Sequence, residues 1–120
     1  MEHVILPVIA RFYIAQLVLA LQYIHSLDIA YRDIKTENIM IDKHGYCKLI
    51  DFGYAKQLNE MKTYTLCGCA DYTAPEMVQS RGHGGMVDWW ALGVLAYELL
   101  TGYTPFSDSD PFNTYQRIIS

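Results

Sequence analysis

Four polar side chains have the types and spacing needed for chemistry on a phosphate group: Asp33, Lys35, Asn38 and Asp51. Carboxylate and amide oxygens are ligands that Mg²⁺ accepts beside phosphate oxygens. An ammonium group can neutralise the charge that builds up while a phosphoryl group moves. Either aspartate alone could simply cap a turn. The joint arrangement instead indicates metal-assisted phosphoryl chemistry.

A short β-hairpin is expected to bring these groups together. Two apolar runs, 38–42 and 47–50, flank a link that contains a glycine, which is the pattern of two strands and a turn. Asn38 comes at the start of the first strand and Asp51 directly after the second. The hairpin therefore predicts that both side chains reach one edge.

Helices are expected around this hairpin. Residues 7–27 carry an i, i+3, i+4 apolar stripe with further apolar residues on other faces, which predicts a helix buried in a core. A membrane span is the competing interpretation, but polar residues interrupt every window of spanning length. Asp88–Leu100 is apolar almost all round and predicts an interior helix ending at Gly102. A last helix is expected from Pro111, with a cap just before it.

Composition limits the classes of function. The 120 residues make one domain or part of one, and the net charge of −4 argues against nucleic acid or an anionic membrane as the main partner. The three cysteines form no even disulfide framework, which favours a reducing compartment, the cytoplasm or the nucleus. Cys67 and Cys69 lack the spacing of a zinc site.

The order D-x-K-x-x-N, hairpin, Asp51-Phe52-Gly53, then Ala74-Pro75-Glu76, resembles the catalytic domain of protein kinases. Tyr31-Arg32-Asp33 and Gly102–Phe106 are most similar to the cyclic-nucleotide-dependent, AGC-type serine/threonine kinases. The resemblance implies a mainly α fold with a small β-hairpin, a partial α+β C-terminal lobe over residues 1–120. We expect the N-terminal lobe to be absent, because no glycine-rich loop or strand lysine precedes residues 31–38, the expected catalytic loop.

The resemblance implies a role for each polar group. Asp33 would accept or orient the proton of the attacking hydroxyl, and Lys35 would neutralise the γ-phosphoryl group of ATP. The cofactors would be ATP and Mg²⁺, and the residues implied to bind them are Asn38, Met40, Asp51 and Gly53. Among these, Asn38 and Asp51 would hold the metal, Met40 would lie beneath the adenine ring, and Gly53 would allow a sharp turn.

Regulation and substrate choice follow from the same resemblance. Thr65 would be a phosphorylation site, with Arg32 and Lys56 as the basic groups that bind its phosphate. Glu37 and Glu98 would receive an arginine upstream of the target residue. The implied partners are basic peptides and a kinase regulatory subunit, with neither nucleic acid nor membrane.

Several positions depart from the pattern of the family, and one of them bears directly on the candidate site. Cys69 stands where a threonine hydroxyl bridges the catalytic aspartate and lysine. A thiol is a poor hydrogen-bond donor, so this departure bears on the hydrogen bonding of Asp33.

The predicted function is that of a serine/threonine protein kinase, present as a truncated catalytic domain and expected to be inactive alone. The first rival is a non-catalytic kinase fragment that docks peptides or a regulator. The second rival is an unrelated helical interaction module whose motifs match by chance.

Overall fold

The computed structural model describes residues 4–120, and helices dominate it. The helices are α1 (Pro7–Ser26), α2 (Pro75–Val78), α3 (Met86–Thr101) and α4 (Pro111–Ile119), with 3-10 turns η1 (Thr36–Asn38) and η2 (Ala70–Tyr72). The strands are β1 (Ile29–Ala30), β2 (Ile39–Ile41), β3 (Cys47–Leu49) and β4 (Lys56–Gln57). The expected mainly helical fold with a small hairpin is confirmed.

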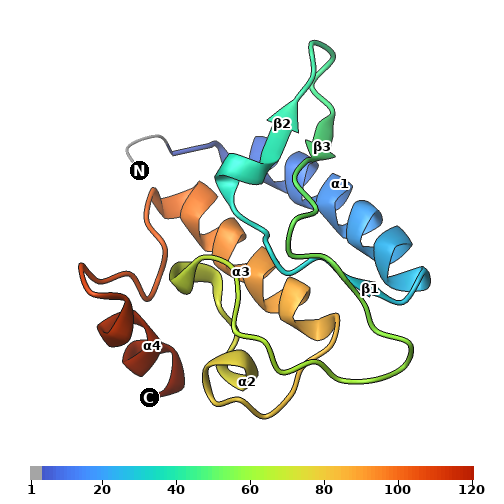
Figure 1. Ribbon diagram of the computed structural model, residues 1–120. Coiled ribbons are helices and arrows are strands. Elements are labelled where there is room, and N and C mark those ends of the chain that lie inside the picture. Colours follow the sequence, from blue (N-terminus) through green and yellow to red (C-terminus); the bar gives the residue numbers. More distant parts are fainter. Residues whose placement is uncertain (1–3) are drawn as a thin grey trace.

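The core lies where α1 and α3 run side by side (Figure 1). The buried side chains of the core recur along one face of each helix: Leu17, Leu21 and Ile24 on α1, and Leu92, Leu95 and Leu99 on α3. Burial of these branched side chains supplies the main favourable term in folding.

α1 packs into the core as predicted, but along one face only. Its second apolar face lies at the surface, with Leu19 66% exposed and Phe12 49% exposed. A helix needs only one stripe to dock against a core, so apolar composition alone did not decide the other face. By length and composition α1 is also apolar enough to cross a membrane, although its Leu17 side packs into the core.

The end of α3 and the start of α4 lie where their sequences predict. Gly102 takes a left-handed conformation (φ 90°) at the end of α3, which β-carbon-bearing residues adopt at a cost. At the start of α4 the Asp110 carboxylate accepts the backbone N–H of Phe112, and Pro111 occupies the first turn. α3 starts two residues earlier than predicted, at Met86.

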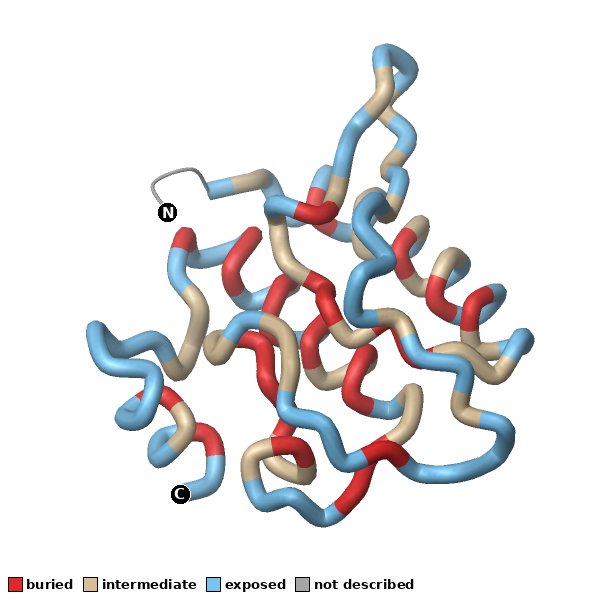
Figure 2. Tube along the Cα trace, viewed as in Figure 1, coloured by how far each residue is buried: buried red, intermediate tan, exposed pale blue. Residues whose placement is uncertain are grey.

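The hairpin β2–β3 is antiparallel, with Ile39 paired to Leu49 and Ile41 to Cys47. One carboxylate oxygen of Asp42 holds its turn by accepting the N–H groups of His44 and Tyr46. The hairpin projects from the helical body (Figure 1), and its tip is largely exposed (Figure 2).

A second pairing, β1 with β4, is missing from the sequence-based expectations. Ala30 pairs with Lys56 and Ile29 with Gln57, which ties the entry of the catalytic loop to the segment after Gly53. Strands of two residues are too short to show a period of alternation, so no pattern announces them.

Candidate active site

Asp88, at the start of α3, holds the backbone of the catalytic loop. Its two carboxylate oxygens accept the N–H of Tyr31 at 2.9 Å and the N–H of Arg32 at 2.8 Å. A third contact, at 2.8 Å, joins the same carboxylate to Nε2 of His25 at the end of α1. The carboxylate is fully buried, so these partners replace its lost hydration. The core helices therefore fix where Asp33 lies.

Asp33 and Asn38 face each other across the loop. Nδ2 of Asn38 donates to the Asp33 carboxylate oxygen Oδ2 at 2.7 Å and to its backbone carbonyl at 2.8 Å. The ammonium nitrogen of Lys35 lies 3.8 Å from the other carboxylate oxygen, Oδ1, too far for a hydrogen bond. The three residues form one polar cluster.

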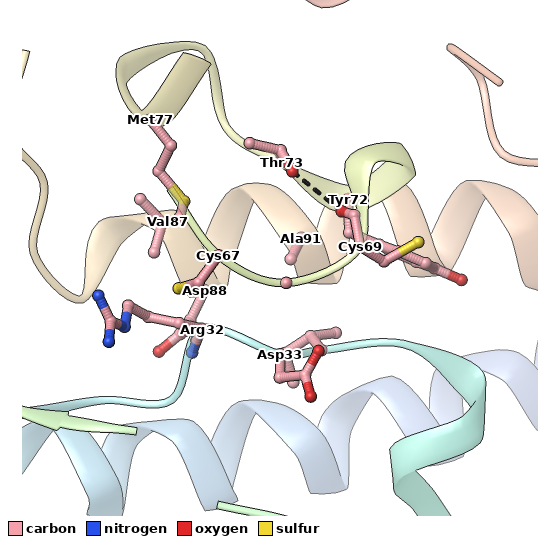
Figure 3. Close-up of a pocket in the computed structure, with 12 residues that line it drawn as sticks. Arg32, Asp33, Cys67, Cys69, Tyr72, Thr73, Met77, Val87, Asp88 and Ala91 are labelled. Atoms are coloured by element: carbon pink, nitrogen blue, oxygen red, sulfur yellow. Dashed lines mark hydrogen bonds between the residues drawn. The ribbon is translucent and has the colours of Figure 1, made fainter. Parts of the chain in front are cut away.

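Oδ1 of Asp33 is a buried acceptor with no hydrogen-bond partner among residues 4–120. The residue is only 5% exposed, and it lines a small cavity between the catalytic loop and the segment that carries Cys67 and Cys69 (Figure 3). Buried acceptors in folded proteins are nearly always paired. This atom is therefore available to a donor that enters the cavity.

Asp51 is held next to Asn38 by backbone bonds. The N–H of Ile50 donates to the carbonyl of Asn38 at 3.0 Å, and the hydroxyl of Tyr31 donates to the carbonyl of Ile50 at 2.6 Å. The ring of Phe52 meets the ring of Tyr31 edge-on, with centroids 5.0 Å apart. Burial, then the nearby carboxylates with Asp33 first, raise the pKa of Tyr31 far above its ordinary range, so its hydroxyl stays a donor.

The Asp51 side chain itself is exposed and has local support only. Its Oδ1 accepts the N–H of Gly53 at 3.0 Å, and its backbone is left-handed (φ 58°). A β-carbon on residue 53 would lie 3.0 Å from that oxygen, closer than side chains normally come. Glycine at position 53 avoids this close contact with the Asp51 side chain.

These residues fit a magnesium ion. The amide nitrogen of Asn38 is used by Asp33, which leaves the amide oxygen for a cation, and Asp51 offers a carboxylate oxygen on the neighbouring strand end. Mg²⁺ commonly takes one or two protein oxygens and completes its shell with water and phosphate. Within residues 4–120 no three His, Cys, Asp or Glu side chains gather into a metal site, so a richer cage is not formed there. Met40, on β2, is 55% exposed and open to a ligand.

Glu37 and Glu98 line one acidic cavity, together with Asp71. Glu98 is only 8% exposed, and its carboxylate accepts the hydroxyl of Tyr72. Burial first, and then this hydrogen bond to a carboxylate, raise the pKa of Tyr72. The structure brings the predicted pair together in a pocket where a guanidinium would find partly desolvated carboxylates.

The segment that carries Thr65 crosses above Arg32. Nε of Arg32 donates to the carbonyl of Tyr54 at 2.8 Å, and Nη1 lies 3.4 Å from Nε2 of His83. Thr65 and Lys56 are exposed, and no hydrogen bond joins Thr65 to Arg32 or Lys56 in the described part of the chain. The residues predicted to form the phosphate-binding site thus lie near the surface, but they are not gathered into a closed site.

Cys69 does not bridge Asp33 and Lys35. Its thiol makes no hydrogen bond to either residue within 4–120, and the hydroxyl of Thr73 donates to the Cys69 carbonyl at 2.9 Å (Figure 3). Burial raises the pKa of the Cys69 thiol. The departure predicted from the sequence coincides with the unpaired Oδ1 of Asp33.

Sequence reasoning missed two histidines. The sequence indicates no role for either residue, whereas His25 contacts Asp88 and His83 is buried against Arg32. Both contacts join residues more than fifty positions apart, so no local pattern could reveal them.

The model of the protein kinase domain family matches residues 2–120 of the chain. The chain belongs to the protein kinase family. It is 55% identical over 92% of its length to cAMP-dependent protein kinase catalytic subunit 3 of Drosophila melanogaster. It is 53% identical over 91% of its length to the cAMP-dependent protein kinase catalytic subunit PRKX of Homo sapiens. The catalytic subunit of Dictyostelium discoideum is 52% identical over 92% of the chain.

The chain covers only part of each of these kinases: 19% of the Drosophila protein, 30% of the human protein and 17% of the Dictyostelium protein. The recognised resemblance to serine/threonine kinases of the cAMP-dependent type is confirmed at the level of the family. Protein kinases as a family use ATP and Mg²⁺ and act on proteins.

Proposed function

We propose that this chain supplies the catalytic and peptide-binding half of a serine/threonine protein kinase. The observation that carries the proposal is the buried, unpaired Oδ1 of Asp33, with the ammonium nitrogen of Lys35 3.8 Å away. An acceptor and a cation at one point suit a hydroxyl donor that attacks a phosphoryl group.

Each residue has a stated part in that reaction. Asp33 orients the serine hydroxyl and accepts its proton, while Asn38 keeps the Asp33 carboxylate in place through its 2.7 Å bond. Lys35 places positive charge beside the phosphoryl oxygens. Asn38 and Asp51 would hold Mg²⁺, which neutralises phosphate charge when it is bound.

The substrates we propose are peptides with an arginine before the target serine. The acidic cavity of Glu37, Asp71 and Glu98 supports this, because a guanidinium can fork between carboxylates. Phosphorylation of Thr65, with its phosphate bound by Arg32 and Lys56, is proposed to order the segment over the cavity. A regulatory subunit as second partner and a cytoplasmic or nuclear location belong to the same proposal, the latter supported by free Cys47, Cys67 and Cys69.

A segment exchange tests this function. Residues 4–120 replace the aligned region of the Drosophila kinase, and transfer from labelled ATP to an arginine-containing serine peptide is measured. The chimera should phosphorylate the peptide, and Asp33→Asn should lower kcat by roughly 10²–10⁴-fold, the usual worth of a general base. An Asp42→Asn chimera, changed in the hairpin turn away from the reacting groups and the acidic cavity, is the control for folding and should keep kcat.

A docking module without turnover is the second candidate, favoured by the same acidic cavity. It predicts an inactive chimera together with peptide binding by the 120-residue chain. That binding should weaken with salt and be lost in a Glu37→Gln, Glu98→Gln double variant, which keeps a hydrogen-bonding partner for Tyr72. An active chimera with an inactive Asp33→Asn variant would refute this candidate.

A further inference from the structure

His83 lies where the Thr65 segment crosses the loop before α3. The backbones of His83 and Thr63 exchange two hydrogen bonds, of 2.8 and 2.9 Å, as an isolated antiparallel bridge. The residue is 3% exposed, and Nε2 of its ring lies 3.4 Å from Nη1 of Arg32. A guanidinium can only donate, so the imidazole accepts there and is neutral.

The charges around His83 come from each neighbouring element. Burial first, and then the Arg32 cation, lower the pKa of His83, whereas the carboxylates of Glu76 on α2 and Asp88 on α3 act in the opposite direction. Lys62 lies beside the adjoining Gly82. Burial and the Arg32 cation together outweigh the two carboxylates, so the pKa of His83 lies below its ordinary value.

The Arg32 guanidinium has neutral partners only. It contacts the Tyr54 carbonyl and the His83 ring, and within residues 4–120 no carboxylate lies within ion-pairing distance of it. A partly buried guanidinium without a counter-charge is a favourable place for an anion.

Thr65 lies between two points that are fixed to this pair. Two residues before it, Thr63 is bonded to the His83 backbone. Three residues after it, a β-carbon on Gly68 would lie 2.8 Å from the Arg32 carbonyl. Thr63 is buried and Cys67 lines the cavity with Arg32, so the chain on both sides of the exposed Thr65 lies against the Arg32–His83 pair.

We propose that His83 is a third ligand for a phosphate on Thr65, beside Arg32 and Lys56, and that it takes up a proton from solvent when this phosphate arrives. The inference rests on the proposed phosphorylation of Thr65. A phosphomonoester brings nearly two negative charges, enough to offset both a guanidinium and an adjacent imidazolium. The phosphate charge would therefore favour the protonated His83 ring over the neutral ring.

The test is the titration of histidine ring signals by NMR between roughly pH 5 and 8 in the 120-residue chain, with threonine or phosphothreonine incorporated at position 65. Phosphorylation should raise the proton affinity of His83 about tenfold or more, as an opposite charge at contact distance does. His44, in the exposed hairpin turn, is the internal control and should not change. An unchanged titration of His83 would overturn the proposal.

A second measurement uses His83→Gln, which keeps a polar group of similar length but cannot titrate. Without phosphate the lowered pKa of His83 means that stability is full above about pH 6.5 and falls as pH drops toward the lowered value. With phosphate on Thr65, a raised pKa of His83 reverses the direction of this pH dependence. The stabilisation by phosphorylation should therefore grow as pH falls. The same pH profile in His83→Gln would count against the proposal. Neither readout depends on phosphoryl transfer, so an inactive chimera leaves this test intact.

Discussion

The two halves of the candidate site are supported in opposite ways. The catalytic-loop half, with Asp33 and Asn38, is buried and its backbone is bonded to Asp88 on a core helix. The other half, with Asp51 as the proposed metal ligand and called the metal half below, is exposed and depends on one local bond to Gly53 and on the Tyr31 hydroxyl bonded to Ile50.

This difference indicates where the same contacts support both the stability of the fold and the proposed function. Around Asp33 the same contacts hold the fold and position the carboxylate proposed to accept the proton, so changes should affect both stability and function. Around Asp51 the local turn contributes little to the core, and changes should affect function alone. Substitutions ranked by their effect on the free energy of unfolding test that contrast.

The largest effect is expected for Asp88→Ala. It leaves the N–H groups of Tyr31 and Arg32 without acceptors, and Tyr31 is fully buried. Loss of a buried hydrogen-bonded charge should lower the free energy of unfolding by about 3–5 kcal/mol, measured by urea denaturation.

Asp42→Ala is the matched control for this change. Asp42 also accepts two backbone N–H groups, from His44 and Tyr46, but in an exposed turn where water can replace it. Its substitution should cost much less than that of Asp88. Equal losses for the two aspartates would remove the distinction between a core support and a local one.

The next effect compares two glycines with the same φ of 86°, Gly68 and Gly45. A β-carbon on Gly68 would meet the Arg32 carbonyl at 2.8 Å, whereas one on Gly45 meets nothing within 4 Å. Both alanine variants bear the left-handed strain of about 1 kcal/mol, and Gly68→Ala should cost roughly another 1–2 kcal/mol from the backbone contact. Thermal unfolding of the pair measures the difference, and a larger loss at Gly45 would contradict it.

Tyr31→Phe should have a smaller effect. It removes the 2.6 Å bond to the Ile50 carbonyl while keeping the ring against Phe52. The loss should be about 1 kcal/mol in urea denaturation, the usual net worth of one hydrogen bond. Tyr72→Phe, which removes the hydroxyl bonded to Glu98, is the comparison on the other side of the site. A Tyr31→Phe variant as stable as the parent chain would show that the two halves are not linked through this hydroxyl.

The sequence predicted the elements because their signals are local. The stripe from Leu17 to Ile24, the cap at Asp110 and the hairpin around its glycine turn depend on neighbours a few residues apart. The spacing of Asp33, Asn38 and the hairpin likewise predicted that the polar groups would meet at one end.

What the sequence could not predict depends on distant contacts. The β1–β4 pairing, the bond from His25 to Asp88 and the contact of His83 with Arg32 each join separate elements. The exposure of Leu19 on α1 was missed for a related reason, since composition does not tell which face meets the core. Long-range packing determines these features. A single sequence contains no periodic pattern from which they can be predicted.

The smallest effect on stability is expected for Asp51→Asn. The amide keeps an oxygen for the N–H of Gly53, and asparagine tolerates the left-handed backbone at φ 58°. The free energy of unfolding should change by no more than about 0.5 kcal/mol, as for most surface substitutions. Removing the charge should nevertheless weaken Mg²⁺ binding, measured by metal titration in the presence of ATP in the Drosophila chimera. If Asp51→Asn instead unfolded the chain as Asp88→Ala does, the metal half would belong to the core, and the contrast between the two halves would be wrong.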